Sequence, residues 1–97
     1  MPYITKGRRP DFEYELNSLA YKIKLHEPGE LSYIISSLLA RLVTKENING
    51  GINYARLSKW RGVIIDASDE FYRRVMAPYE DIKQEENGDV YDNVFEV

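Results

Sequence analysis

The chain has 97 residues, 43% of them hydrophobic, and a formal net charge of −3. Its length excludes two independent domains, its apolar content excludes a disordered chain, and no apolar run approaches the roughly 20 residues of a membrane-spanning helix. The absence of cysteine excludes disulfides, zinc–thiolate sites and cysteine nucleophiles. The start MPYITKGRRPDF lacks the apolar stretch of a secretory signal. We therefore expect one domain, residues 1–97, in the cytoplasm and without membrane contact.

The first predicted elements are an N-terminal arm, residues 1–9, and a helix from Pro10 to about Leu25. Pro10 suits the first turn of a helix, where its missing N–H costs nothing. Residues 26–30, HEPGE, predict a turn, because Pro and Gly together interrupt helical patterns. The first helix carries an apolar stripe formed by Phe12, Leu16, Leu19 and Ile23.

A second helix is predicted from residue 31 to about Lys45. Its apolar residues cover nearly half of its circumference, which is more than a surface helix needs. We therefore expect this helix to form the centre of the core. These apolar residues are Leu31, Ile34, Ile35, Leu38, Leu39, Leu42 and Val43.

A third helix is predicted from Asn53 to Ala77, after a break at residues 45–51 and before Pro78. The side chain of Asn53 can cap the first N–H groups. The helix has two apolar faces about 100° apart, and a chain of this size supplies a packing partner for only one. We therefore expect a homo-oligomer. One face holds Leu57, Trp60, Ile64, Ala67, Phe71 and Val75, and the other holds Tyr54, Ile65, Tyr72 and Met76.

The last part of the chain predicts a short fourth helix over residues 79–86, ended by Gly88, and an acidic arm over residues 88–97. Residues 1–77 hold twelve Lys/Arg and nine Asp/Glu, whereas residues 78–97 hold one Lys and seven Asp/Glu. Such a tail either docks on a basic surface of its own or a neighbouring subunit, or stays solvated. The predicted fold class is all-α. We expect a small helical bundle of three main helices plus a short fourth helix (body 10–87) and an extended acidic C-terminal arm, assembled as an oligomer.

Four segments resemble a family of short proteins of unknown function found in phages and bacterial genomes. They are the MPYI start, NYARL at 53–57, YRRV at 72–75, and APYED at 77–81 followed by ENGDVY at 86–91. The resemblance spans residue 1 to about residue 91 and implies helices, a phage-like setting, and hence the cytoplasm of a host cell. The segment Trp60-Arg61-Gly62 and the tail after Tyr91 depart from the family pattern.

The candidate ligand site is a cationic and aromatic set at a subunit interface. Guanidinium groups bind phosphate bidentately, and aromatic rings can stack on a base. Arg56 and Arg74 flank the apolar stripe of the third helix, so neither points fully away from whatever that stripe packs on. The opposite interpretation, in which the arginines pair with Asp66, Asp69, Glu70 and the acidic tail, remains open. The ligand-binding candidates are Tyr3, Arg8, Arg9, Tyr33, Arg56, Arg73, Arg74 and Tyr79.

Catalytic chemistry is disfavoured by the residues available. Asp66, Asp69 and Glu70 have the i, i+3, i+4 spacing of bundle metal sites, but a second set of carboxylates is missing. His26, the only histidine, stands beside a turn, where a structural role is favoured. No glycine-rich phosphate loop is present. We expect no enzyme, metal or cofactor, and a pI near 5.1 opposes nucleic-acid binding.

Three functional hypotheses follow. The first is a phage-type protein that sequesters a small anionic nucleotide, such as a host immune signal, at homo-oligomer interfaces. The second is a protein-interaction module or inhibitor that acts through the acidic C-terminal arm. The third is a metal-dependent nucleotide hydrolase. The sequence predicts self-association for the first hypothesis but identifies no particular ligand, partner or subunit number.

Overall fold

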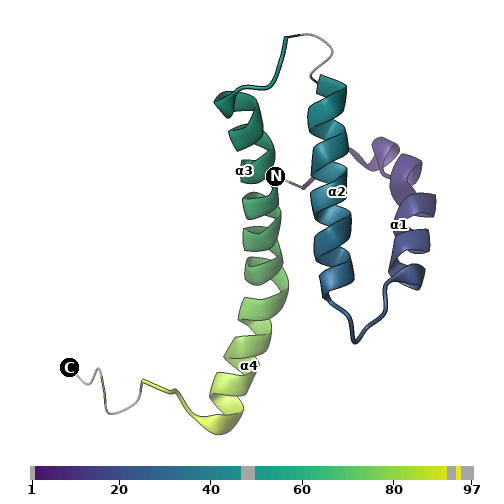
Figure 1. The fold of residues 1–97 in the computed structure, drawn as a ribbon. Coiled ribbons are helices and arrows are strands. Elements are labelled where there is room, and N and C mark those ends of the chain that lie inside the picture. The colour runs from purple at the N-terminus through teal and green to yellow at the C-terminus, as the bar shows by residue number, and fades with distance from the viewer. Residues whose placement is uncertain (1, 47–49, 92–93, 95–97) are drawn as a thin grey trace. The chain divides into compact units, whose positions relative to one another are not determined.

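The computed structural model describes residues 2–46, 50–91 and 94, and all regular structure in these residues is helical (Figure 1). The predicted all-α class is therefore confirmed. The chain divides into two compact units, residues 3–62 and residues 63–97 with the first two residues, and each is described by itself. The single domain stays a prediction. The elements are a 3-10 turn η1 (Lys6–Arg8), helices α1 (Pro10–Lys22), α2 (Gly29–Glu46) and α3 (Tyr54–Phe71), a π-helix η3 (Tyr72–Met76) and helix α4 (Ala77–Asn87).

Helix α1 begins at Pro10, as the sequence predicts, but ends before the expected Leu25. Ile23 is extended, with φ −67° and ψ 127°, although its N–H still donates to the Leu19 carbonyl. The next N–H, that of Lys24, donates to Oε1 of Glu30 at 2.7 Å. This bond fastens the end of α1 to the start of α2. It depends on a residue six positions away, so helical periodicity does not reveal it.

Helix α2 begins at Gly29, two residues earlier than predicted, and Pro28 directly precedes its first turn. The N–H groups of Glu30 and Leu31 donate to the carbonyls of Glu27 and Pro28, at 3.0 and 3.1 Å. Proline is tolerated there because the first N–H groups of a helix have no partner within it. The predicted turn at residues 26–30 is therefore shorter than expected.

Asn53 caps α3 as the sequence predicts, since its Oδ1 accepts the N–H of Arg56 at 3.0 Å. The side chain of Arg56 folds back over the preceding loop and donates to the Gly51 carbonyl at 2.6 Å. Both bonds stabilise the sharp entry into α3. Residues 47–49, within the predicted break, lie outside the described residues.

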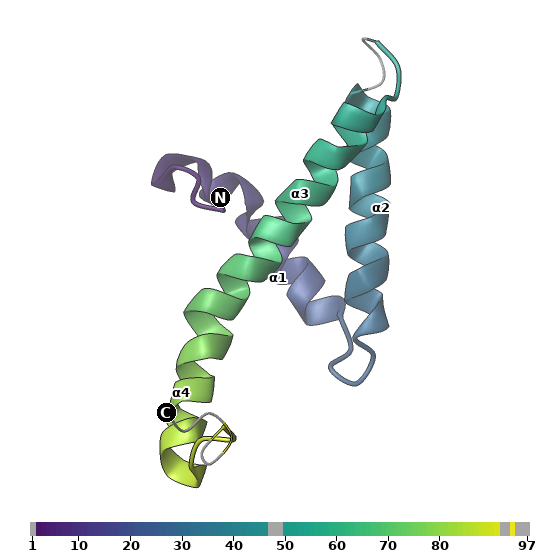
Figure 2. The same ribbon diagram turned by 90° about the vertical axis from the view of Figure 1, so that its left-hand side faces the viewer.

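The predicted interruption at Pro78 is wrong, because helical structure continues from α3 through η3 into α4 (Figure 2). In an α-helix the ring of Pro78 would clash with the carbonyl of Arg74, four residues earlier. The wider π turn, in which the Ala77 N–H bonds the Tyr72 carbonyl, avoids this clash. Pro78 then occupies the first turn of α4. The predicted end of this helix is confirmed, since Gly88 has φ 89° and its N–H donates to Gln84.

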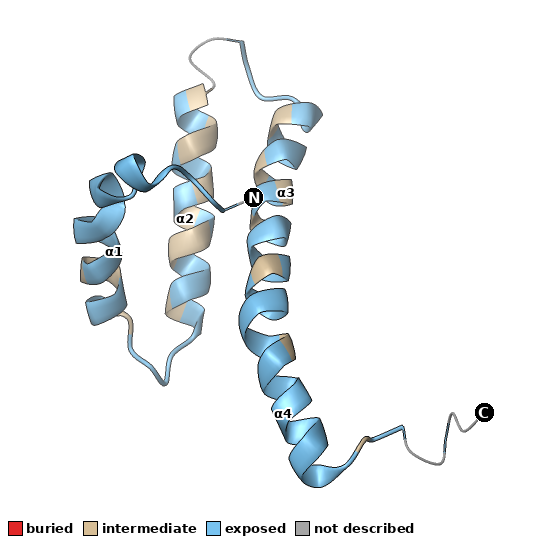
Figure 3. Ribbon diagram, turned by 180° about the vertical axis from the view of Figure 1, so that it is seen from behind, coloured by how far each residue is buried: buried red, intermediate tan, exposed pale blue. Residues whose placement is uncertain are grey.

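Burial in the single chain is shallow throughout. Every described residue is exposed or partly exposed, and none is buried (Figure 3). Leu38 of α2 is 54% exposed and Phe71 of α3 is 58% exposed. Such side chains gain only part of the roughly 1.5–3 kcal/mol that full burial gives. The expectation that α2 forms the centre of a core is therefore not met by one chain alone.

Among the described helices, none combines the length and the apolar character that crossing a bilayer requires.

Candidate functional site

The candidate site is a groove between α1 and α2, close to the turn that joins them. Its volume is about 470 Å³, which lies within the range of about 300–1,000 Å³ for small-molecule sites. Its apolar lining follows from the i, i+4 spacing of Leu19 and Ile23, which places both on one face of α1. The other lining residues are Lys22, Glu30, Tyr33 and Ile34.

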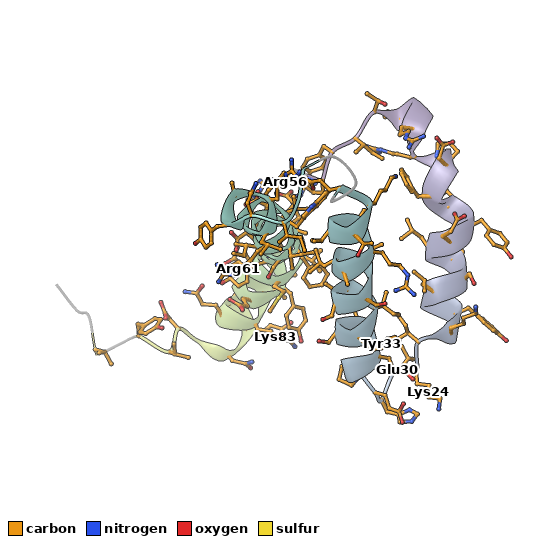
Figure 4. The ribbon with its side chains drawn as sticks, turned by 45° about the horizontal axis from the view of Figure 1, so that its top comes forward. Lys24, Glu30, Tyr33, Arg56, Arg61 and Lys83 are labelled. Carbon is orange, nitrogen blue, oxygen red and sulfur yellow. The ribbon has the colours of Figure 1, made fainter. Side chains whose placement is uncertain are left out.

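The polar groups of this groove lie at its rim. Tyr33 is 74% exposed, and Figure 4 shows it on α2 near Lys24 and Glu30. The Glu30 carboxylate is held by the Lys24 N–H, so it is fixed in place by the backbone. Lys22 adds a cation on α1. The groove thus combines an apolar floor with one aromatic ring, one ammonium group and one carboxylate, a set suited to a flat ring that carries polar substituents.

Among the residues of this groove, only Tyr33 is one of the predicted ligand-binding residues. Leu19 and Ile23 were predicted only as part of the apolar stripe of the first helix, and Lys22 was not predicted. The sequence does contain a pattern that predicts this groove: Lys22 stands beside the apolar stripe of the first helix, and Tyr33 follows the turn after it. The prediction of the ligand site relied instead on the arginines elsewhere in the chain.

The other predicted site residues of the unit 3–62 do not gather around Tyr33. Arg8 pairs with Asp11 at 2.5 Å and lies over the ring of Phe12 at 5.2 Å from its centroid. Arg9 donates from Nε to the Ile4 carbonyl at 3.2 Å. Both arginines come just before the first residue of α1, whereas Tyr33 belongs to α2, which follows the last residue of α1. The remaining member of the predicted set at this end of the chain is Tyr3, which is half exposed.

Arg56 belongs to a polar cluster that joins the end of α2 to the start of α3. Glu46 accepts from Nζ of Lys59 at 3.0 Å and from Nε1 of Trp60 at 2.8 Å, and Nε of Arg56 lies 3.5 Å from it. The hydrogen bond from Lys59, then that from Trp60, lowers the pKa of the Glu46 carboxyl. Lys59 also lies over the Trp60 ring, 4.6 Å from its centroid. Arg56 is therefore engaged in holding the loop closed.

The predicted residues of the unit 63–97 lie around η3. Arg73 pairs with Glu70 at 2.8 Å, as the open alternative interpretation expected. Arg74 has no carboxylate partner within the part of the chain that the structure describes. Tyr79 is exposed, with Nζ of Lys83 5.7 Å from its ring centroid. The Tyr72 hydroxyl donates to Glu80 at 3.0 Å, and this bond raises the pKa of Tyr72.

A second hollow, of about 500 Å³, lies where the chain turns back after α4. Gln84 donates to the Asp89 carboxylate at 3.0 Å, and the same carboxylate accepts the Tyr91 N–H at 2.9 Å. These bonds shape residues 88–91 into a turn, whereas residues 92–93 and 95–97 of the predicted arm lie outside the described residues. The lining carries an excess of negative charge and consists of Glu80, Asp81, Lys83, Gln84, Asn87, Gly88, Asp89, Val90 and Tyr91.

The acidic set Asp66, Asp69 and Glu70 was weighed as a metal site. In residues 2–46, 50–91 and 94, no three His, Cys, Asp or Glu side chains gather in a way that could hold a metal ion. Glu70 instead binds Arg73. The third hypothesis, a metal-dependent hydrolase, thus has no geometric support in these residues.

These features define a small all-helical protein with an apolar groove and no described buried side chain. The chain belongs to the family described as Domain of unknown function (DUF6899), whose family model matches residues 1–90. This agrees with the resemblance to a family of unknown function. Neither a curated protein nor a solved structure matches the chain.

Proposed function

We propose that this protein is a self-associating helical binding protein that sequesters a small anionic nucleotide. The observation that carries the proposal is the groove between α1 and α2, with Leu19 and Ile23 as its floor and Tyr33 and Lys22 at its rim. The ring of Tyr33 stacks on the base, and the ammonium of Lys22 pairs with a phosphate. Arginines of neighbouring subunits add positive charge at the subunit interface. The proposal includes binding only and no reaction of the nucleotide.

Self-association is supported by the shallow burial of the described side chains. A folded chain normally buries a continuous apolar core, and a chain that does not can complete one with copies of itself. Arg61 and Arg74 are exposed and have no carboxylate partner in the described part of their own chain. Both are therefore available to anionic groups of a ligand or a neighbouring subunit.

The proposal predicts that Tyr33→Ala weakens nucleotide binding by roughly tenfold to a hundredfold. Stacking of a base on an aromatic side chain contributes about 1–3 kcal/mol, which corresponds to that range. Isothermal titration against a panel of cyclic and ADP-ribose-derived nucleotides measures the effect. Tyr14→Ala is the matched control, because Tyr14 is equally exposed on α1 and does not line the groove.

Two results of this titration would overturn the proposal. One is uniformly absent heat from protein that circular dichroism shows to be helical and light scattering shows to be assembled. The other is binding that Tyr33→Ala and Lys22→Ala leave unchanged.

A second candidate function is protein recognition through the C-terminal region. It is favoured by the acidic hollow beside α4, in which Asp81 and Asp89 lie next to the exposed Tyr91. Such a surface fits a basic protein segment. A basic peptide in the same calorimeter separates the two functions, since heat that disappears on deletion of residues 88–97 supports recognition by this region.

A further inference from the structure

The long helical run from α3 through η3 to α4 presents an apolar stripe without cover. Phe71, Val75, Tyr79 and Ile82 follow one another at intervals of four, four and three residues, so they lie along one side of the helix. Their exposed fractions are 58%, 53%, 60% and 54%. Four large side chains in a row form a patch of the kind that marks an interaction surface.

The charges along the same helical run identify the partner. Residues 54–62 contain Arg56, Lys59 and Arg61 and no acid. Glu46 pairs with both Arg56 and Lys59, but its single negative charge leaves this end of the run with a positive excess. Helix α4 contains one Lys and four acids, namely Glu80, Asp81, Lys83, Glu85 and Glu86. The helix dipole has the same polarity as these charges, positive at the first end and negative at the last. The run is therefore complementary to a reversed copy of itself.

We propose that a second copy of this chain docks antiparallel on the α3–η3–α4 stripe, with its basic end against the acidic α4. This inference deepens the self-association in the proposed function and rests on it. The run spans residues 54–87, so the two-fold axis passes near residues 70 and 71. Phe71 then packs near its own copy. The dimer contains two contacts between a basic end and an acidic end, one on each side of the axis. A parallel arrangement would set like charges side by side at both ends.

The absence of native cysteine permits a clean test by single spin labels. Ser58→Cys and Ser68→Cys lie on the same helix, and both positions are exposed. At a rise of 1.5 Å per residue, antiparallel pairing separates the two copies of position 58 by about 37 Å along the axis and those of position 68 by about 8 Å. Parallel pairing brings both pairs level, at about the 8–10 Å distance between packed helices. Dipolar spectroscopy measures both distances in the full chain.

A substitution tests the stripe itself. Phe71→Asp places two unpaired carboxylates at the centre of the interface, where burial of charge is costly. We expect it to weaken dimerisation about a hundredfold or more in sedimentation equilibrium. Tyr21→Asp is the control on α1, where it replaces another exposed aromatic residue away from the stripe, and it should leave dimerisation unchanged.

The outcomes separate this inference from the proposed function. A long distance at position 58 with a short one at position 68, lost on Phe71→Asp, supports the antiparallel dimer. Two short distances, or an assembly indifferent to Phe71→Asp, overturn the dimer and leave self-association and nucleotide binding standing. A lone protomer at high concentration overturns the dimer and self-association together, and nucleotide titration then decides whether the groove binds.

Discussion

At the scale of single residues, Glu46 links the end of α2 to the start of α3. It stands at the last position of α2 and accepts from two groups of α3, Nζ of Lys59 and Nε1 of Trp60. These bonds link the two helices on either side of the connection. The hydrogen bonds from Lys59 and Trp60 also explain the lowered pKa of the carboxyl, because donors favour its charged form.

Glu46→Gln is expected to lower the thermal midpoint at neutral pH, since an amide keeps an acceptor for Trp60 but loses both ion pairs. A carboxyl with a lowered folded-state pKa stabilises the fold above the ordinary glutamate pKa. That contribution is lost as the pH falls through the lowered value. The difference in thermal midpoint between Glu46→Gln and the unmodified protein should therefore become smaller at acidic pH. Thermal unfolding followed by circular dichroism measures this difference.

The control for this substitution is Glu15→Gln on α1. Glu15 has no ion pair in the described part of the chain. A difference between Glu46→Gln and the unmodified protein that is the same at neutral and acidic pH would show that the ion pairs do not stabilise the connection.

At the scale of elements, local chemistry was read correctly from the sequence wherever a cap or a periodic stripe controls it. Pro10 at the start of α1, Asn53 before α3 and Gly88 after α4 all stand as predicted. The errors fall where a bond reaches beyond the local pattern. The end of α1 depends on the distant Glu30, and the passage across Pro78 depends on a π turn, which periodicity at 3.6 residues per turn does not detect.

The π turn gives Pro78→Ala a specific consequence. Without the proline ring, nothing favours the wider turn, and the helix can return to α geometry. Closing the π turn to an α turn rotates α4 by about 100° relative to the second half of α3. Tyr79 and Ile82 keep a helical spacing that leaves them on the same side as Phe71, but their angular positions change, so the interface has to repack. We expect dimerisation to weaken roughly tenfold in sedimentation equilibrium, while helix content stays equal or rises.

Pro28→Ala is the matched control, because it removes a proline from the first turn of α2, away from the stripe. It should leave the dimer dissociation constant unchanged. Equal dissociation constants for Pro78→Ala and the unmodified protein would mean that the π turn does not align the stripe.

At the scale of the whole molecule, the candidate site was the least predictable feature. The arginines chosen from the sequence share a charge, but charge alone does not fix where a flexible side chain finds its partner. Arg8, Arg56 and Arg73 lie within 4 Å of nearby carboxylates, at distances that only the folded backbone sets. The groove formed by Leu19, Ile23 and Tyr33 was hidden because an apolar stripe predicts burial whether it lines a core or a ligand site.

The shallow burial of the described side chains leads to a prediction about unfolding of the whole protein. If the dimer interface supplies a large share of the buried apolar surface, folding is linked to association, and dilution destabilises the folded state. For a dimer of this size, each tenfold rise in concentration should raise the thermal midpoint by about 2–4 °C. Scanning calorimetry over a roughly hundredfold concentration range measures the slope. Phe71→Asp should flatten it, Tyr21→Asp should preserve it, and a flat line for the unmodified protein would mean that each chain folds alone.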